Sequence, residues 1–126
     1  MKNVMAIIRI DRMNQTKQAL KDIGISSMTA TGKVFGRGKG LWEAKVLEAA
    51  RKNEPEAIAL LGSEPRLRPQ RVVQIIVPDS RVDDVVQTLI EVNQTPAAGD
   101  GKIFVLPVYD AIRIRTTESG DTVLDQ

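Results

Sequence analysis

Two short segments near the C-terminus contain residue types that hold phosphate groups. Residues 99–102 read Gly-Asp-Gly-Lys and lead into an apolar stretch. Residues 112–116 read Ile-Arg-Ile-Arg-Thr, and the two-residue period of a strand would place Arg113 and Arg115 on one face. Glycine lets backbone N–H groups approach an anion, while lysine and arginine add positive charge. Together they favour a phosphate site, although alone the first is more typical of an ordinary turn and the second equally fits a solvated strand edge.

Groups that could perform catalysis are scarce. The chain has no cysteine and no histidine, which excludes disulfides, thiolate nucleophiles, histidine-dependent triads and imidazole metal sites. Asp79, Asp83 and Asp84 fall at a predicted helix start, where they complement the helix dipole. The glutamates between 43 and 56 have no evident partner base or nucleophile. We therefore predict a protein that is not an enzyme.

The composition indicates one globular domain, residues 1–126, with an aliphatic core. Hydrophobic residues make up 42% of the chain and aromatic residues only 3%. The net charge of +2 is too small to favour a nucleic-acid partner. No apolar run is long enough to insert into a membrane, and the first residues lack the layout of a signal peptide. We expect a cytoplasmic protein.

Hydrophobic periodicity predicts four strands and two helices. The strands are expected at 4–10, 25–35, 72–77 and 102–109, and the helices at 13–23 and from 79 or 80 onward. Asn14 is the expected cap of the first helix, and Asp79 or Ser80 of the second. The order strand, helix, strand, strand, helix, strand predicts an α+β, ferredoxin-like fold, in which both helices cover one face of a four-stranded antiparallel sheet.

The third predicted strand is apolar on both faces. Val73, Ile75 and Val77 alternate with Val72 and Ile76, and residues 103–108 show the same pattern. Because the helices can cover only one face, we expect the other to pack against sister subunits. The alternative is that a long insert folds back over it.

That insert, residues 36–70, is too long for a simple hairpin. It is basic, since residues 33–71 contain nine lysines and arginines against five glutamates, and a helix is expected at 41–53. Docking onto another protein and a solvated loop explain its composition equally well.

Several short motifs resemble the PII nitrogen-signalling family over nearly the whole chain outside the insert. They are Ala-Ile-Ile-Arg at 6–9, Ile-Ser-Ser-Met-Thr-Ala-Thr at 25–31, Phe-Gly-Arg at 35–37, Val-Pro-Asp at 77–79, Gln-Thr at 94–95, Gly-Asp-Gly-Lys-Ile-Phe-Val at 99–105 and Ala-Ile-Arg-Ile-Arg-Thr at 111–116. The resemblance implies a homotrimer that binds ATP or ADP in three clefts between subunits. It also implies that the insert is a T-loop, which contacts a target protein such as nitrogenase, an ammonium channel or glutamine synthetase. The Gly-Arg-Gly-Lys run at 36–39, together with Met28-Thr29-Ala30 and the long loop, resembles the branch encoded with nitrogenase.

The resemblance also assigns roles to individual residues. Those around the phosphates would be Gly99, Asp100, Gly101 and Lys102, with Arg113 and Arg115 reaching them from an adjacent loop. Those on the base and ribose side would be Ile7, Met28, Thr29 and Ile76, with Gly36 and Arg37 closing the cleft. For Ile7 and Ile76 the alternative is a simple core position.

The chain departs from the family pattern at several of these places. Gly38 or Gly40 stands where relatives carry a glutamine that helps to hold Mg²⁺ and 2-oxoglutarate, and Gln70 replaces a lysine that pairs with the oxoacid. A response to 2-oxoglutarate and Mg²⁺ is therefore expected to be weak or absent. Pro96 removes a backbone donor from the phosphate turn. The insert contains no tyrosine, so uridylylation is not expected.

Overall fold

The computed structural model describes residues 1–36 and 67–124. Our expectations for the helix at 41–53 and for Arg37, Gly38 and Gly40 lie outside these residues. The main elements are β1 (Lys2–Arg9), α1 (Met13–Asp22), β2 (Thr29–Ala30), β3 (Val34–Gly36), β4 (Arg68–Val77), α4 (Val82–Asn93) and β5 (Gly101–Pro107). Short 3₁₀ turns occupy Ile10–Arg12, Asp79–Arg81 and Asp121–Val123.

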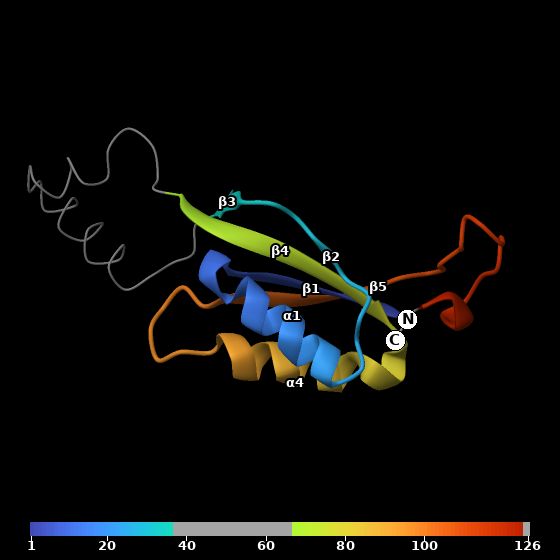
Figure 1. The fold of residues 1–126 in the computed structure, drawn as a ribbon, viewed down its shortest axis with the longest axis horizontal. Helices are drawn as coiled ribbons and strands as arrows, with labels where there is room; N and C mark the ends of the chain where they lie inside the picture. Colours follow the sequence, from blue (N-terminus) through green and yellow to red (C-terminus); the bar gives the residue numbers. More distant parts are fainter. Residues whose placement is uncertain (37–66, 125–126) are drawn as a thin grey trace, which may run out of the picture.

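The strands form one antiparallel sheet with the order β2-β4-β1-β5, and β3 pairs with the first residues of β4. Helices α1 and α4 lie side by side across one face (Figure 1). This arrangement confirms the α+β class and fits the ferredoxin-like architecture. Among the described residues, no helix has the length and apolar character that crossing a bilayer requires.

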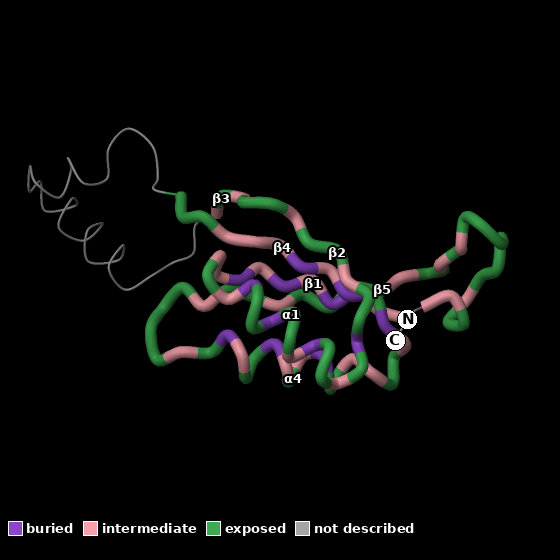
Figure 2. The backbone as a smooth tube through the Cα atoms, viewed as in Figure 1, coloured by how far each residue is buried: buried purple, intermediate pink, exposed green. Residues whose placement is uncertain are grey.

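The core lies between the helices and one face of β1 and β4, as the purple segments of Figure 2 show. Alternate residues of these two strands are buried, because successive side chains of a strand point to opposite faces. The buried strand residues are Val4, Ala6, Ile8, Val73, Ile75 and Val77, and the helices add Met13, Leu20, Val85 and Leu89. The predicted aliphatic core is confirmed.

The opposite face of the sheet keeps apolar side chains exposed. Ile76, Phe104 and Leu106 are 40%, 42% and 40% exposed, although each lies in a strand. The sequence prediction of two apolar sheet faces is therefore confirmed. The described residues leave a surface that an assembly of subunits would bury.

The predicted second strand, 25–35, is wrong in its extent. Ile25 is buried beside α1, where its N–H donates to Leu20 O at 2.9 Å, and strand pairing begins only at Thr29. The chain then leaves the regular strand path at Gly32 and Lys33, so that β2 and β3 are separate pieces. β4 begins earlier than expected, at Arg68, and pairs there with Gly36, so both ends of the predicted insert 36–70 take part in the sheet.

Three further local predictions are wrong. Both helices begin directly after a 3₁₀ turn with no side-chain cap, so neither Asn14 nor Asp79 or Ser80 has the expected role. The expected strand at 112–116 is a turn stabilised by the hydrogen bond from Thr117 N–H to Arg113 O at 2.8 Å. Arg113 and Arg115 therefore do not share a strand face.

Candidate functional site

The loop before β5 is organised around the carboxylate of Asp100. Its two oxygens accept hydrogen bonds from the hydroxyl and from the backbone N–H of Thr95, both at 2.6 Å. The same carboxylate forms an ion pair with Arg9, with Nη2 and Oδ1 3.1 Å apart. These contacts close residues 95–100 into a defined loop and attach it to the end of β1.

Arg9 also contacts the backbone of this loop. Its Nη2 donates to Ala98 O at 2.9 Å, and its Nε donates to Gly99 O at 3.1 Å. The guanidinium thus fixes two successive carbonyl groups as well as the carboxylate of Asp100. Arg9 is not predicted as a site residue from the sequence, although its position two residues after Ile7 places both side chains on the same sheet face.

Gly101 allows β5 to approach β1 closely. Its φ is +111°, and a Cβ built on it would collide with the carbonyl oxygen of Ile7. Gly99 also has a positive φ, +97°. Positive φ values are strained for residues with a side chain, so both glycines are required by the path of the backbone.

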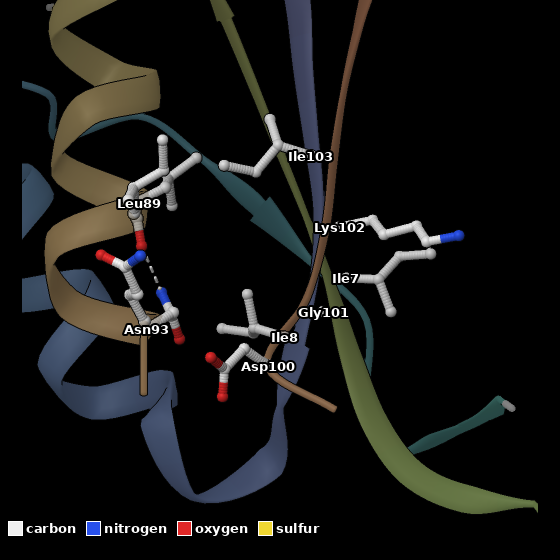
Figure 3. A pocket seen from close by; sticks show the side chains of 10 residues that line it. Ile7, Ile8, Leu89, Asn93, Asp100, Gly101, Lys102 and Ile103 are labelled. Carbon is white, nitrogen blue, oxygen red and sulfur yellow. Dashed lines mark hydrogen bonds between the residues drawn. The ribbon is translucent and has the colours of Figure 1, made fainter. Parts of the chain in front are cut away.

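Lys102 pairs directly with Ile7 across β5 and β1. In Figure 3 both side chains point away from the helices, while Ile8 and Ile103 point towards α4. Ile7 is partly exposed and is not part of the buried core. The structure therefore brings Ile7, Gly101 and Lys102 together at one end of the open sheet face.

Gly36 lies at the same end of the sheet. It pairs with Arg68, and a Cβ on it would collide with the side-chain amide of Gln70. Gln70 in turn pairs with Arg9. The expected position of Gly36 near the phosphate loop is consistent with this pairing.

A hollow of about 270 Å³ lies behind the loop, between α4 and the facing ends of β1 and β5. Figure 3 shows Ile8, Leu89, Asn93 and Asp100 around it. Asn93 is buried, and its Nδ2 donates to Thr16 Oγ1 at 3.2 Å and to Leu89 O at 3.0 Å. The bond to Thr16 joins α4 to α1 beneath the loop, and the bond to Leu89 lies within α4.

Three of the four base-side candidates line a second hollow of about 240 Å³, whereas Ile7 lines the first. The second hollow is lined by Ser27, Met28, Thr29, Gln74, Ile76, Val123 and Leu124. Thr29 is held in register by its pairing with Gln74. Met28, Thr29 and Ile76 are therefore neighbours, and the 40% exposure of Ile76 excludes a simple core position.

One chain does not bring the arginine pair to the glycine loop. Figure 1 shows the segment that follows β5 at the opposite end of the sheet from the loop that precedes it. Lys102 and Pro107, five residues apart on β5, are roughly 17 Å apart at the rise of a strand, and Arg113 and Arg115 follow beyond Pro107. Arg113 contacts Glu118, with Nη1 and Oε2 3.5 Å apart.

Comparisons with known proteins identify the family. The family model described as "Nitrogen regulatory protein P-II" matches residues 1–118. The chain therefore belongs to the P-II family of nitrogen regulatory proteins, which confirms the resemblance seen in the sequence.

Individual relatives support the same assignment. The "Nitrogen fixation nifHD region GlnB-like protein 2" of Methanobacterium ivanovii is 41% identical over 124 residues, covering 98% of this chain and 99% of that protein. "Nitrogen regulatory protein P-II 1" of Escherichia coli is 38% identical over 125 residues, covering 98% of this chain and 100% of that protein. The structure described as "Crystal Structure of Arabidopsis thaliana PII bound to citrate" superposes with a TM-score of 0.72 at 32% identity, covering 99% of this chain and 90% of that one.

Replacing Gly101 with alanine should destabilise the protein more than the same change at other glycines. Gly24 also has a positive φ, +85°, but has open space around it, and Gly32 has open space without a positive φ. We expect Gly32→Ala to stay within about 0.5 kcal/mol of the parent, Gly24→Ala to lose about 1–2 kcal/mol and Gly101→Ala to lose about 1–3 kcal/mol more. Urea unfolding at one protein concentration measures all three, and equal losses for Gly24→Ala and Gly101→Ala would contradict the close approach of β5 to β1.

The pKa of Asp100 should depend on Thr95. The side-chain and backbone hydrogen bonds from Thr95, and then the positive charge of Arg9, lower this pKa below the ordinary value of 3.8. Thr95→Val removes the hydroxyl donor, so the pKa should rise towards 3.8, whereas Thr122→Val, which has no contact with Asp100, should leave it unchanged. Carboxyl ¹³C shifts followed by NMR measure the titration.

The sign of the stability change follows from the direction of this shift. A carboxyl group with a lowered folded pKa stabilises the fold above its unfolded pKa, and this contribution disappears as the pH falls through the folded value. The parent should therefore exceed Thr95→Val in stability at neutral pH, with the difference shrinking below about pH 4. A difference that is constant down to the acid transition would argue against Asp100 as the partner of Thr95.

Proposed function

We propose that this chain is a homotrimeric nitrogen-signalling protein that binds ATP or ADP in clefts between its subunits. The proposal rests on the geometry at the start of β5. There Gly101 closely approaches β1, and Lys102 extends over the sheet face that the helices leave open. A backbone of this kind beside a lysine suits a polyphosphate. Residues 36–70 would then transmit the bound state to a target protein.

The separation of the candidate residues supports binding between subunits. The loop at 99–102 and the arginines at 113 and 115 lie at opposite ends of one sheet. A second copy that covers the exposed apolar face can bring its own far end to the loop of the first. Burial of Ile76, Phe104 and Leu106 would favour that association.

The proposed target is nitrogenase. The relative from Methanobacterium ivanovii is described as a protein of the nifHD region, and gene regions of that kind point to nitrogen fixation. In this proposal the chain acts as a cytoplasmic regulator, and it alters the activity of its target without catalysing a reaction itself. Neither a nucleic acid nor a membrane is needed as a partner.

Calorimetry should detect binding of ATP and ADP, with weaker binding of AMP because it has fewer phosphate oxygens to contact. Lys102→Gln and Arg115→Gln should each weaken ATP binding by roughly tenfold or more, since a hydrogen bond to a charged group contributes about 1.5–3 kcal/mol. Lys17→Gln, on the exposed surface of α1, removes the same charge away from the site and should have little effect. Analytical ultracentrifugation of the same samples should show trimers.

Two outcomes would contradict this prediction. The absence of binding by all three nucleotides at millimolar concentration would remove the nucleotide function, and a strictly monomeric protein would remove the shared cleft. Titrations with and without Mg²⁺ and 2-oxoglutarate complete the design. Because Gln70 presents a neutral amide, we expect 2-oxoglutarate to change ATP affinity little.

A second candidate is a trimeric PII-like binding scaffold with reduced or altered ligand sensing. Pro96 favours it, because this residue is exposed in the loop and supplies no N–H donor. Such a scaffold would act on another target, for example an ammonium channel or glutamine synthetase. Its binding would not depend on nucleotide.

Binding to purified target proteins separates the two candidates. We expect nitrogenase from the same organism to bind this protein with an affinity that differs by at least about tenfold between the ATP-saturated and the ADP-saturated form, a difference of 1.4 kcal/mol in binding free energy. Deletion of residues 37–66 should abolish binding while nucleotide affinity persists. Nucleotide-independent binding to any of the three targets would favour the scaffold.

A further inference from the structure

A second arginine lies beside the glycine loop. Arg68 is the first residue of β4, and its Nη1 lies 3.9 Å from the point that a Cβ on Gly99 would occupy. Arg9 Nη2 lies 3.7 Å from the same point. Two strands that are far apart in the sequence therefore place guanidinium groups on one turn of the loop.

The two arginines differ in what their charges already contact. Arg9 forms an ion pair with Asp100 and donates to two loop carbonyl groups. Within residues 1–36 and 67–124, neither Arg68 nor Lys102 has an acidic partner. Because Asp100 is already paired with Arg9, it does not neutralise the charge of Arg68 or Lys102.

The side chains on the open face of the sheet change from apolar to positively charged along the strands. The apolar side chains, among them Ile76 and Phe104, lie towards one end, and Lys102 lies beside Ile7 nearer the other. Arg68 lies farther out still, because Gln70 already pairs with Arg9 and Arg68 is two residues beyond it. A polyphosphate that contacts Lys102 and extends away from the apolar side chains would therefore reach Arg68 last.

We propose that Arg68 contacts the terminal phosphate group of the bound nucleotide. A guanidinium offers two parallel N–H donors to phosphate oxygens, which suits a terminal group with several free oxygens. The ligand class is a nucleoside di- or triphosphate, and Arg68 would favour it over the monophosphate. This inference rests on the nucleotide-binding function proposed above.

The contact between Arg68 and the terminal phosphate can be tested by calorimetry with ATP, ADP and AMP. The proteins compared are the full-length parent, Arg68→Gln, Arg68→Lys and Lys17→Gln. Arg68→Gln should weaken ATP binding by about tenfold or more and leave AMP binding within about twofold. Arg68→Lys should recover part of the ATP affinity, because it restores the charge without the paired donors. Lys17→Gln should match the parent for every ligand. Thermal unfolding confirms that each variant is folded.

Each remaining outcome overturns the inference in a distinguishable way. Unchanged ATP affinity in Arg68→Gln would exclude a phosphate contact by Arg68 and leave the proposed function intact. An equal loss for ATP, ADP and AMP would show that Arg68 only shapes the loop. Pyrophosphate that binds the parent as tightly as ATP would show a free anion site in place of a nucleotide subsite. A parent protein that binds no nucleotide would remove both proposals.

Discussion

The pairing register between β1 and β5 determines on which face of the sheet the candidate binding residues lie. Ile8 pairs with Gly101 and Ile7 pairs with Lys102, so the apolar member of the first pair faces α4 and the charged member of the second faces outward. A slip of β5 by one residue would turn Lys102 towards the core and Ile103 outward, because side chains alternate along a strand. The ion pair between Arg9 and Asp100 fixes this register at the end of the strands. The contacts that position the sheet edge are therefore the ones that build the candidate site.

The sequence predicted the parts of the structure that depend on local periodicity. The apolar stripe of α4 and the alternation along β4 follow from the spacing of Val85, Leu89, Val73 and Ile75, and each is buried as expected. The contacts of Arg9 could not be predicted in this way, because Arg9 and Gly99 are 90 residues apart in the sequence. The arginine pair at 113 and 115 has the spacing of a strand, but within the described part of the chain this segment forms only the isolated bridge between Ile112 and Ser119, and local turn hydrogen bonds prevail there. The positions of Arg9, Arg113 and Arg115 depend on tertiary contacts, about which the periodicity of the sequence gives no information.

The two ends of the open face have complementary characters. One end has the glycine loop, Lys102 and Arg68, and the other has the hollow lined by Met28, Thr29 and Ile76. The apolar strand residues between them remain exposed in a single chain. The membership of the chain in the P-II family gives this arrangement a regulatory context.

The carboxylate of Asp100 lies in a loop proposed to bind an anion, and the contacts of the loop explain how its charge is accommodated. In Figure 3 the side chain of Asp100 lies near Ile8 and Asn93, whereas Lys102 points to the other side of β5. Its charge is compensated by Arg9, and its oxygens accept both hydrogen bonds from Thr95. Because these contacts lower the pKa of Asp100, the carboxylate remains ionised at neutral pH and keeps Arg9 engaged. Asp100 thus orders the loop and, being paired with Arg9, does not neutralise Lys102.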